Sequence, residues 1–187
     1  MSDKEEQLII SSQQGDILSF ERLISIYQQK IFNIAYFKIQ NSALAEDITQ
    51  EVIVRIFKKI KSFKFKSSFS SWVYRITCNI INDVVKKFKN ISEMSIDEVE
   101  NLGYDDEFKK VENSLEEDIK SEKIKMLISK IPHKFQIVLI LYEVEGKTYE
   151  EIAEILNKNI NTVKTRLYRA RRILKDLILK EAEEILE

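Results

Sequence analysis

Residues 148–172 predict two short helices joined by a tight turn, and this pattern constrains the fold more than any other part of the chain. Thr148 and Glu151 have the spacing of a capping box, which satisfies backbone donors at a helix start. Asn157 breaks the apolar pattern with a residue that tolerates turn geometry, and either Asn161 or Thr162 can cap the second helix. The apolar residues of both helices recur at helical spacing: Ile152, Ile155, Leu156, Val163, Leu167, Ala170 and Leu174.

The second of these helices has a strongly basic surface. Residues 161–172 contain no acid and five cations, which are Lys164, Arg166, Arg169, Arg171 and Arg172. A basic helix face is often only solvated, but an ordinary exposed face mixes both signs of charge. The uniform sign therefore favours a helix that enters a DNA major groove and neutralises phosphates. Arg171 lies nearer the apolar side, and we expect it to pair with Glu150, Glu151 or Glu154 instead.

The rest of the chain also has the pattern of helices. Three Gly and one Pro in 187 residues leave few sites for tight turns, so the composition predicts an all-α fold. Apolar residues at helical intervals predict helices over 16–35, 42–60 and 69–85, and again from Ile124 onward. Asp16 and Ser42 can cap the first two of these. Pro132 suits the first turn of a helix, and Gly146 is a plausible terminator before the capping box.

The net charge of −1 hides an uneven distribution. Residues 1–90 carry fourteen Lys and Arg against nine Asp and Glu, a net charge of +5. Residues 91–122 carry three against twelve, a net charge of −9, and residues 123–187 carry thirteen against ten, a net charge of +3. Two basic segments therefore flank an acidic one that can bury little apolar area, and we expect that segment to be a flexible linker.

Several classes of protein are disfavoured. No apolar run reaches membrane-spanning length, and the polar start is not a signal peptide. A single cysteine, Cys78, indicates a reducing compartment, and we expect it to be a small buried residue. One histidine, His133, leaves too few ligands for a His/Cys metal site, and no phosphate loop or nucleophile elbow occurs. We expect no catalytic residue, cofactor or metal and hence no enzyme, the alternative being a carboxylate-only metal nuclease.

Three segments in order carry a resemblance to a known family. Residues 45–57 (AEDITQEVIVRIF) resemble the core-polymerase-binding helix in region two of extracytoplasmic-function (ECF, group four) RNA polymerase sigma factors. Residues 69–79 (FSSWVYRITCN), followed by Asp83, are similar to the promoter-melting part of that region. Ile131-Pro132 and residues 149–174 are similar to region four. The resemblance implies two small helical domains, region two in 1–90 and region four in 123–187, joined by the acidic linker of 91–122.

For region two, the resemblance assigns residues to two contacts. The largest subunits of core RNA polymerase would meet Asp47, Gln50, Glu51 and Arg55, which the sequence alone would describe as a solvated helix face. The minus-ten promoter element would meet Lys64, Phe65, Lys66, Ser67, Asn79 and Asp83, because strand opening needs cations for phosphate and a group that holds an unstacked base. The spacing of Trp72 favours a core residue over a stacking wedge.

For region four, the resemblance places the helix-turn-helix of 149–168 on the minus-thirty-five element. The contacting residues would be Thr162, Lys164, Thr165, Arg166, Tyr168, Arg169 and Arg172. Lys164 and Arg169 suit the guanine acceptors of base edges, and the others suit phosphates. The chain departs from the common pattern at Phe57, Tyr142, Asn157 and Asn161, and Tyr142 replaces an arginine that contacts promoter backbone.

The implied partners are core RNA polymerase, promoter DNA and an anti-sigma factor. No small-molecule substrate and no direct membrane insertion are expected. The expected location is the bacterial cytoplasm, at the membrane where the anti-sigma protein is membrane-bound. The acidic linker would run through the polymerase, where it can act as a nucleic-acid mimic. The rival hypothesis is a free-standing repressor or activator that binds palindromic duplex as a dimer.

Overall fold

The computed structural model describes residues 3–94 and 123–184, with side chains in 3–87 and 123–183. Within these ranges the regular structure is helical and no strand occurs, which confirms the all-α prediction. The chain divides into two compact units. Among the described residues, the first unit holds 3–36 and 42–94, and the second holds 37–41 and 123–184. Residues 95–122 of the expected linker lie outside the described residues.

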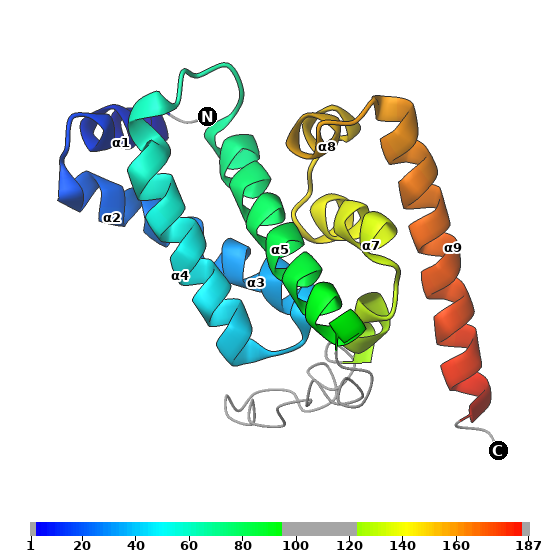
Figure 1. Cartoon of the computed structure of the whole chain (residues 1–187). Helices are drawn as coiled ribbons and strands as arrows, with labels where there is room; N and C mark the ends of the chain where they lie inside the picture. The colour runs from blue at the N-terminus through cyan, green and yellow to red at the C-terminus, as the bar shows by residue number, and fades with distance from the viewer. Residues whose placement is uncertain (1–2, 95–122, 185–187) are drawn as a thin grey trace, which may run out of the picture. The chain divides into compact units, whose positions relative to one another are not determined.

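The first unit is a helical bundle (Figure 1). Its elements are α1 (Asp3–Gln13), α2 (Ile17–Ser25), most of α3 (Gln28–Ile39), α4 (Ser42–Lys59), the 3₁₀ turn η1 (Ile60–Ser62) and α5 (Phe69–Met94). The end of α3, from Phe37 onward, belongs to the second unit. The first helix, α1, was not predicted from the sequence. The side-chain amide of Gln13 in α1 donates to the carbonyls of Ile60, at 2.9 Å, and Phe63, at 2.8 Å. With Ile9 fully buried, these bonds attach α1 to the turn after α4.

The apolar pattern of 16–35 predicted one helix, but two form. Asp16 caps α2 as expected, because its carboxylate accepts from the backbone N–H of Leu18 at 3.1 Å. The helix then tightens, with the N–H of Tyr27 bonded to the carbonyl of Ile24 at 2.8 Å. The buried Tyr27 donates its hydroxyl to Glu5 of α1, and its ring meets the edge of Phe69. A tertiary anchor at Tyr27 therefore interrupts a continuous helical pattern.

Helices α4 and α5 pack against each other and supply much of the core of this unit. The predicted stripe of α4 is buried at Ile48, Val52 and Ile56, and α5 buries Phe69, Val73, Ile76, Ile80 and Ile81. Each such side chain contributes roughly 1.5–3 kcal/mol through burial. Because the stripe faces inward, the opposite side of α4 is turned to solvent. Helix α5 continues to Met94, four residues into the expected linker.

The second unit contains the predicted helix-turn-helix. Residues 123–129 are helical, followed by α7 (His133–Leu139), the π-helical turn η2 (Ile140–Val144), α8 (Tyr149–Leu156) and α9 (Ile160–Glu184). Helix α9 packs against both α7 and α8 (Figure 1). The core of the second unit includes Ile131, Val138, Leu141, Ile152, Ile155, Val163, Leu167 and Ala170. Pro132 is the N-cap of α7, one position before the expected first turn.

Candidate functional site

The connection before α8 orients the helix-turn-helix. Gly146 has a φ of +61°, a left-handed conformation that glycine adopts without strain. The capping box is present as predicted, since the side chain of Thr148 accepts from the N–H of Glu151 at 3.2 Å and the carboxylate of Glu151 accepts from the N–H of Thr148 at 3.0 Å. Burial favours a raised pKa for Glu151, but its hydrogen bonds with Thr148 and Lys147 outweigh it and lower the pKa.

The turn between α8 and α9 places the recognition helix. Asn157 adopts the left-handed region, with a φ of 50°, as expected for a residue in place of glycine. The cap of α9 is not Asn161 or Thr162, as predicted, but Asn159, whose Oδ1 accepts from the N–H of Thr162 at 2.7 Å. Asparagine and threonine are both favourable N-cap residues, so the local sequence could not select one of the three positions. Helix α9 consequently begins at Ile160, and Asn161 belongs to its first turn.

The buried seam of α9 directs the basic residues outward. Val163, Leu167 and Ala170 are buried, as predicted. The expected promoter contacts lie outside this seam, either exposed or half-buried: Thr162, Lys164, Thr165, Arg166, Tyr168, Arg169 and Arg172. Tyr168 is 68% exposed, the most exposed large hydrophobic residue among those described. The structure therefore brings the predicted set together on one helix surface, with Lys164 and Arg169 towards opposite flanks.

One flank of α9 borders a polar concavity of about 440 Å³. From α9 and its cap it is lined by Asn159, Asn161, Thr162, Thr165, Arg166 and Arg169, and from α7 by Lys134 and Phe135. Lys134 was not among the predicted contacts. It is exposed in the first turn of α7, and its ammonium lies 5.0 Å from the centroid of the Phe135 ring. Three cations therefore surround the concavity, a favourable arrangement for a phosphate backbone. The only feature of the sequence that indicates this contact is a lysine directly after Pro132 and His133.

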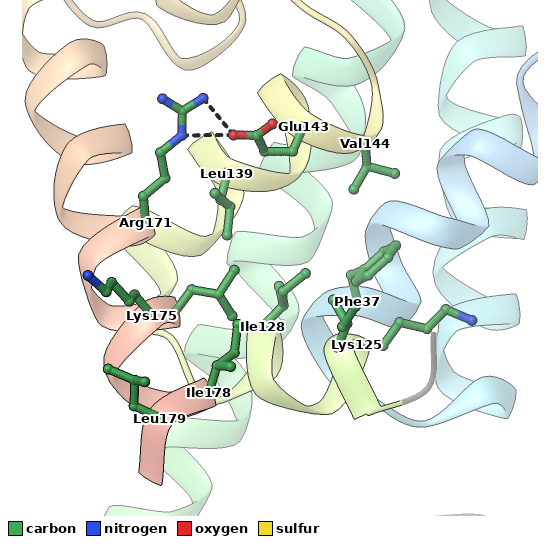
Figure 2. Close-up of a pocket in the computed structure, with 12 residues that line it drawn as sticks. Phe37, Lys125, Ile128, Leu139, Glu143, Val144, Arg171, Lys175, Ile178 and Leu179 are labelled. Atoms are coloured by element: carbon green, nitrogen blue, oxygen red, sulfur yellow. Dashed lines mark hydrogen bonds and ion pairs between the residues drawn. The ribbon is translucent and has the colours of Figure 1, made fainter. Parts of the chain in front are cut away.

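The other flank meets two tyrosines. The ammonium of Lys164 lies 5.6 Å from the ring centroid of Tyr149, which stacks on Tyr142 at 5.1 Å. The guanidinium carbon of Arg171 lies 5.1 Å from the centroid of Tyr142. The prediction that Arg171 pairs with Glu150, Glu151 or Glu154 is wrong, because Arg171 pairs with Glu143 at 2.7 Å (Figure 2). Glu151 instead pairs with Lys147 at 3.1 Å and completes the capping box.

An apolar groove of about 690 Å³ lies below this ion pair (Figure 2). Its lining includes Ile124, Ile128, Leu139, Val144, Leu174, Ile178 and Leu179. Ile178 and Leu179 on the last turns of α9 are about half exposed, at 46% and 52%. The sequence does not reveal this groove, because its walls come from segments that lie far apart along the chain, from Phe37 to Leu179.

In the first unit, the outward side of α4 carries the expected polymerase contacts. Asp47, Gln50, Glu51 and Arg55 are all exposed, and Glu51 pairs with Arg55 at 2.8 Å. Two apolar side chains that were not selected are also exposed on α4, Val54 at 49% and Phe57 at 53%. Phe57 meets the edge of Phe20 at 5.0 Å. The helix therefore presents charged and apolar groups together, which is the composition of a protein interface.

The loop before α5 is built on an aromatic cluster. Phe63 is buried and contacts Phe65, Phe69 and Trp72, with centroids 4.9 to 5.3 Å apart. Phe65 has a φ of 55°, which is strained for a residue with a Cβ, and is 39% exposed. The centroid of Trp72 also lies 5.5 Å from that of Phe69, and Trp72 is half-buried at the edge of the cluster rather than in the core. The cluster thus supports an exposed aromatic ring between the exposed cations Lys64 and Lys66.

The remaining expected minus-ten residues lie further along α5. Ser67 is half-buried in the loop, whereas Asn79 and Asp83 are exposed one turn apart. Ten residues of helix, about 15 Å at 1.5 Å per residue, separate Phe69 from Asn79. The structure thus does not gather these residues into one cluster but spaces them along α5. Cys78, between them in the sequence, is buried as expected, and burial raises the pKa of its thiol to about 12.

Two features are absent from the parts of the chain that the structure describes, residues 3–94 and 123–184. No group of three or more His, Cys, Asp and Glu side chains is placed there to hold a metal ion. None of the helices described is both long enough and apolar enough to cross a membrane.

Comparison with known proteins agrees with this geometry. Sigma-70 region 2 matches residues 23–90, and Sigma-70 region 4 matches residues 121–174. The ECF RNA polymerase sigma factor SigW of Bacillus subtilis is 34% identical over 167 residues, covering 86% of this chain and 89% of SigW. The sigma-E factor of Escherichia coli is 29% identical, covering 89% of this chain and 90% of that protein.

Two solved structures share the fold. One is the sigma factor RpoE of Bartonella quintana in complex with the anti-sigma factor NepR, with a TM-score of 0.73, 20% identity and coverage of 87% of this chain and 98% of that one. The other is CnrH in complex with the cytosolic domain of CnrY, with a TM-score of 0.70, 18% identity and coverage of 94% and 97%.

The two sigma-70 regions, in order and each on a helical unit, define a transcription initiation factor of the sigma class. The chain belongs to the ECF RNA polymerase sigma factor family. Its function is promoter-specific transcription initiation.

Proposed function

We propose that the first unit binds core RNA polymerase through α4 and opens the minus-ten element, while α9 reads the minus-thirty-five element. The observation that carries the proposal is the uniform charge of the α9 surface, with five cations and no acid in residues 161–172. We assign region two to 1–90, the linker to 91–122 and region four to 123–187. An acidic linker suits this division, because its charge keeps it from competing with the basic units for DNA.

At the minus-thirty-five element, Lys164 and Arg169 reach base edges from the two flanks of α9. Long cationic donors suit the N7 and O6 acceptors of guanine in the major groove. Thr162, Thr165, Arg166, Tyr168 and Arg172 hold phosphates and set the register of the helix. Lys134 adds a phosphate contact from α7, since the concavity that it shares with Arg166 and Arg169 is positively charged.

At the minus-ten element, Phe65 stacks on an unpaired base while Lys64 and Lys66 contact the adjoining phosphates. The left-handed backbone of Phe65 supports this role, because strained conformations of residues other than glycine concentrate at functional sites. Ser67 completes the loop contact. Asn79 and Asp83 follow the separated strand along the exposed side of α5.

Core polymerase binds the outward side of α4. Asp47, Gln50, Glu51 and Arg55 supply polar contacts, and the half-exposed Val54 and Phe57 supply the apolar centre that stable interfaces use. Because Glu51 and Arg55 already pair with each other, their geometry is set before the polymerase binds.

An anti-sigma protein is the expected inhibitor. The two solved structures with the same fold are complexes, one with NepR and one with the cytosolic domain of CnrY. The exposed apolar residues of this chain offer contact area for such a partner. The factor acts in the bacterial cytoplasm, at the membrane where its anti-sigma protein is a membrane protein. It has no catalytic residue, no cofactor and no small-molecule substrate.

Run-off transcription on a promoter library tests the proposal. Purified core polymerase with this chain should initiate at a defined set of promoters that core alone does not select. Lys164→Ala and Arg169→Ala should each relax selection in the minus-thirty-five element. Initiation no more specific than that of core alone would contradict the proposal.

Two further measurements separate the rival functions. A free-standing repressor would bind palindromic duplex as a dimer without polymerase, which sedimentation and footprinting would detect. A metal nuclease would cleave DNA when divalent metal is titrated in. We expect neither result.

A further inference from the structure

The flank of α9 that carries Lys164 meets a pair of parallel tyrosine rings, the Tyr142–Tyr149 stack. The two ring centroids are 5.1 Å apart and the ring planes are inclined by 21°. Lys164 Nζ lies 5.6 Å from the centroid of Tyr149, and the guanidinium carbon of Arg171 lies 5.1 Å from that of Tyr142. Each ring therefore has a cation of α9 within the range of a cation–π attraction.

The backbone around the stack holds both rings in place. Tyr142 belongs to the π-helical turn η2, and Tyr149 is the first residue of α8. Between them, the N–H of Lys147 donates to the carbonyl of Leu141 at 2.9 Å, while Gly146 makes the left-handed turn. A π-helical turn is rare and often marks a functional position. Here it brings together two rings that are seven residues apart in the sequence.

The two ends of the stack differ in their partners. Arg171 is bound to Glu143 through both Nε, at 2.8 Å, and Nη2, at 2.7 Å, so that end is anchored by an ion pair. Lys164 forms no ion pair in the described part of the chain, and its ammonium remains exposed. Interaction with the Tyr142 hydroxyl also raises the pKa of Tyr149, in keeping with closely placed hydroxyl groups.

We propose that Tyr142 is a positioning residue, which acts through Tyr149 to hold the ammonium of Lys164 ready for contact with a base edge of the minus-thirty-five element. The inference rests on the proposed role of Lys164. A lysine side chain has many rotamers, and ordering it opposes binding. A ring that already restricts Lys164 in the unbound protein lowers this cost. In this chain Tyr142 therefore affects which bases Lys164 recognises and makes no phosphate contact itself.

The first test is spectroscopic and uses the full chain without DNA. In NMR spectra, ring currents of Tyr149 should shift the ε-methylene protons of Lys164 upfield. Tyr142→Phe retains the stacked ring and should keep the shift, whereas Tyr149→Ala should abolish it. Tyr142→Leu, which fills similar space without an aromatic ring, should reduce it. An unchanged shift in Tyr142→Leu would overturn the inference.

The second test uses the holoenzyme and promoters substituted at each minus-thirty-five position. Tyr142→Leu removes the ring that supports Tyr149 and should lower base discrimination by about threefold, the loss expected when the exposed cation–π contact between Lys164 and Tyr149 is no longer held. The loss should occur only at positions that Lys164→Ala also affects. Positions affected by Arg169→Ala should be unchanged, and Tyr142→Phe should match the wild type. In a Lys164→Ala background, Tyr142→Leu should have no further effect on discrimination. Thermal unfolding of each variant checks that the second unit is folded.

The outcomes separate the inference from the function on which it rests. If Lys164→Ala leaves discrimination unchanged at every position, the proposed role of Lys164 fails and this inference fails with it. If Lys164→Ala acts but Tyr142→Leu lowers binding equally at all positions, or still acts without Lys164, only the inference is overturned. A loss in Tyr142→Phe equal to that in Tyr142→Leu would assign the effect to the hydroxyl and also overturn it.

Discussion

Arg171 donates to one carboxylate oxygen of Glu143 through two of its nitrogens, Nη2 at 2.7 Å and Nε at 2.8 Å. The pair joins α9 to η2 across 28 residues of sequence. The hydrogen bond to Glu143 raises the pKa of Arg171, whose guanidinium is in any case protonated at physiological pH. One of the five cations of the recognition helix is therefore committed to the protein, and its neighbour Arg172 is left facing outward.

The first prediction follows from this contrast. Arg172→Ala should reduce the salt slope of promoter binding by about 0.9, the value for one phosphate contact, whereas Arg171→Ala should leave the slope unchanged. Arg171→Ala should instead lower the free energy of unfolding, by at most about 1 kcal/mol because the pair is half exposed. Holoenzyme binding over a range of salt and thermal unfolding measure the two effects. Equal slopes for both variants would show that Arg171 also contacts phosphate.

Lys134 should behave as a phosphate contact without sequence preference. Lys134→Ala should weaken holoenzyme binding to all minus-thirty-five sequences alike and reduce the salt slope by about 0.9. Lys180→Ala, an exposed lysine eleven residues beyond Arg169 on α9, is the matched control and should have no effect. A change in sequence preference in Lys134→Ala would instead indicate that Lys134 reads a base.

The cap of α9 should be measurable as stability. Asn159→Ala removes the acceptor of the Thr162 N–H and should lower the free energy of unfolding by about 1 kcal/mol. Asn161→Ala, at a position that the structure places inside the first turn, should cost much less. Chemical denaturation of both variants makes the comparison. A larger loss in Asn161→Ala would restore the cap expected from the sequence.

The outward side of α4 should bind core polymerase through its apolar residues. Val54→Asp places a charge in the expected centre of the interface and should weaken core binding by about tenfold or more, as at an interface hot spot. The fold should tolerate it, because Val54 is 49% exposed. Ile17→Asp makes the same change on α2, where Ile17 is 60% exposed. Equal losses in direct binding assays with core polymerase would argue against α4 as the contact surface.

The buried thiol of Cys78 should make the free energy of unfolding depend on pH. Burial raises the pKa of its thiol from 9.0 to about 12, so above pH 9 the unfolded chain loses this proton while the native protein retains it. The free energy of unfolding should therefore fall as pH rises from 9 towards 12, by up to about 1.4 kcal/mol per pH unit. Because lysines and tyrosines also titrate there, the measurement compares the wild type with Cys78→Ala. Parallel pH profiles would refute the prediction.

Local patterns account for most of what could be predicted. The capping box at Thr148, the turn at Asn157 and the buried seam at Val163 depend on residues within a few positions of each other, and each was confirmed. The predicted N-cap of α9 was wrong, because Asn159, Asn161 and Thr162 have similar capping propensities and the structure uses Asn159. Helix α1 was not predicted because its stability comes from contacts with α2 and η1 rather than from its own apolar pattern.

The sequence by itself determined most of the helices, the charge of each segment and the family, since periodicity and motifs are local properties of the chain. Only the tertiary structure decided which partner each side chain has. It assigned Arg171 to Glu143, placed Lys134 beside Arg166, and set Tyr149 between Tyr142 and Lys164. These contacts join different elements, and many pairings of similar local energy are available to an unfolded chain. Packing of the buried seam selects one of them and so fixes which cations remain for DNA.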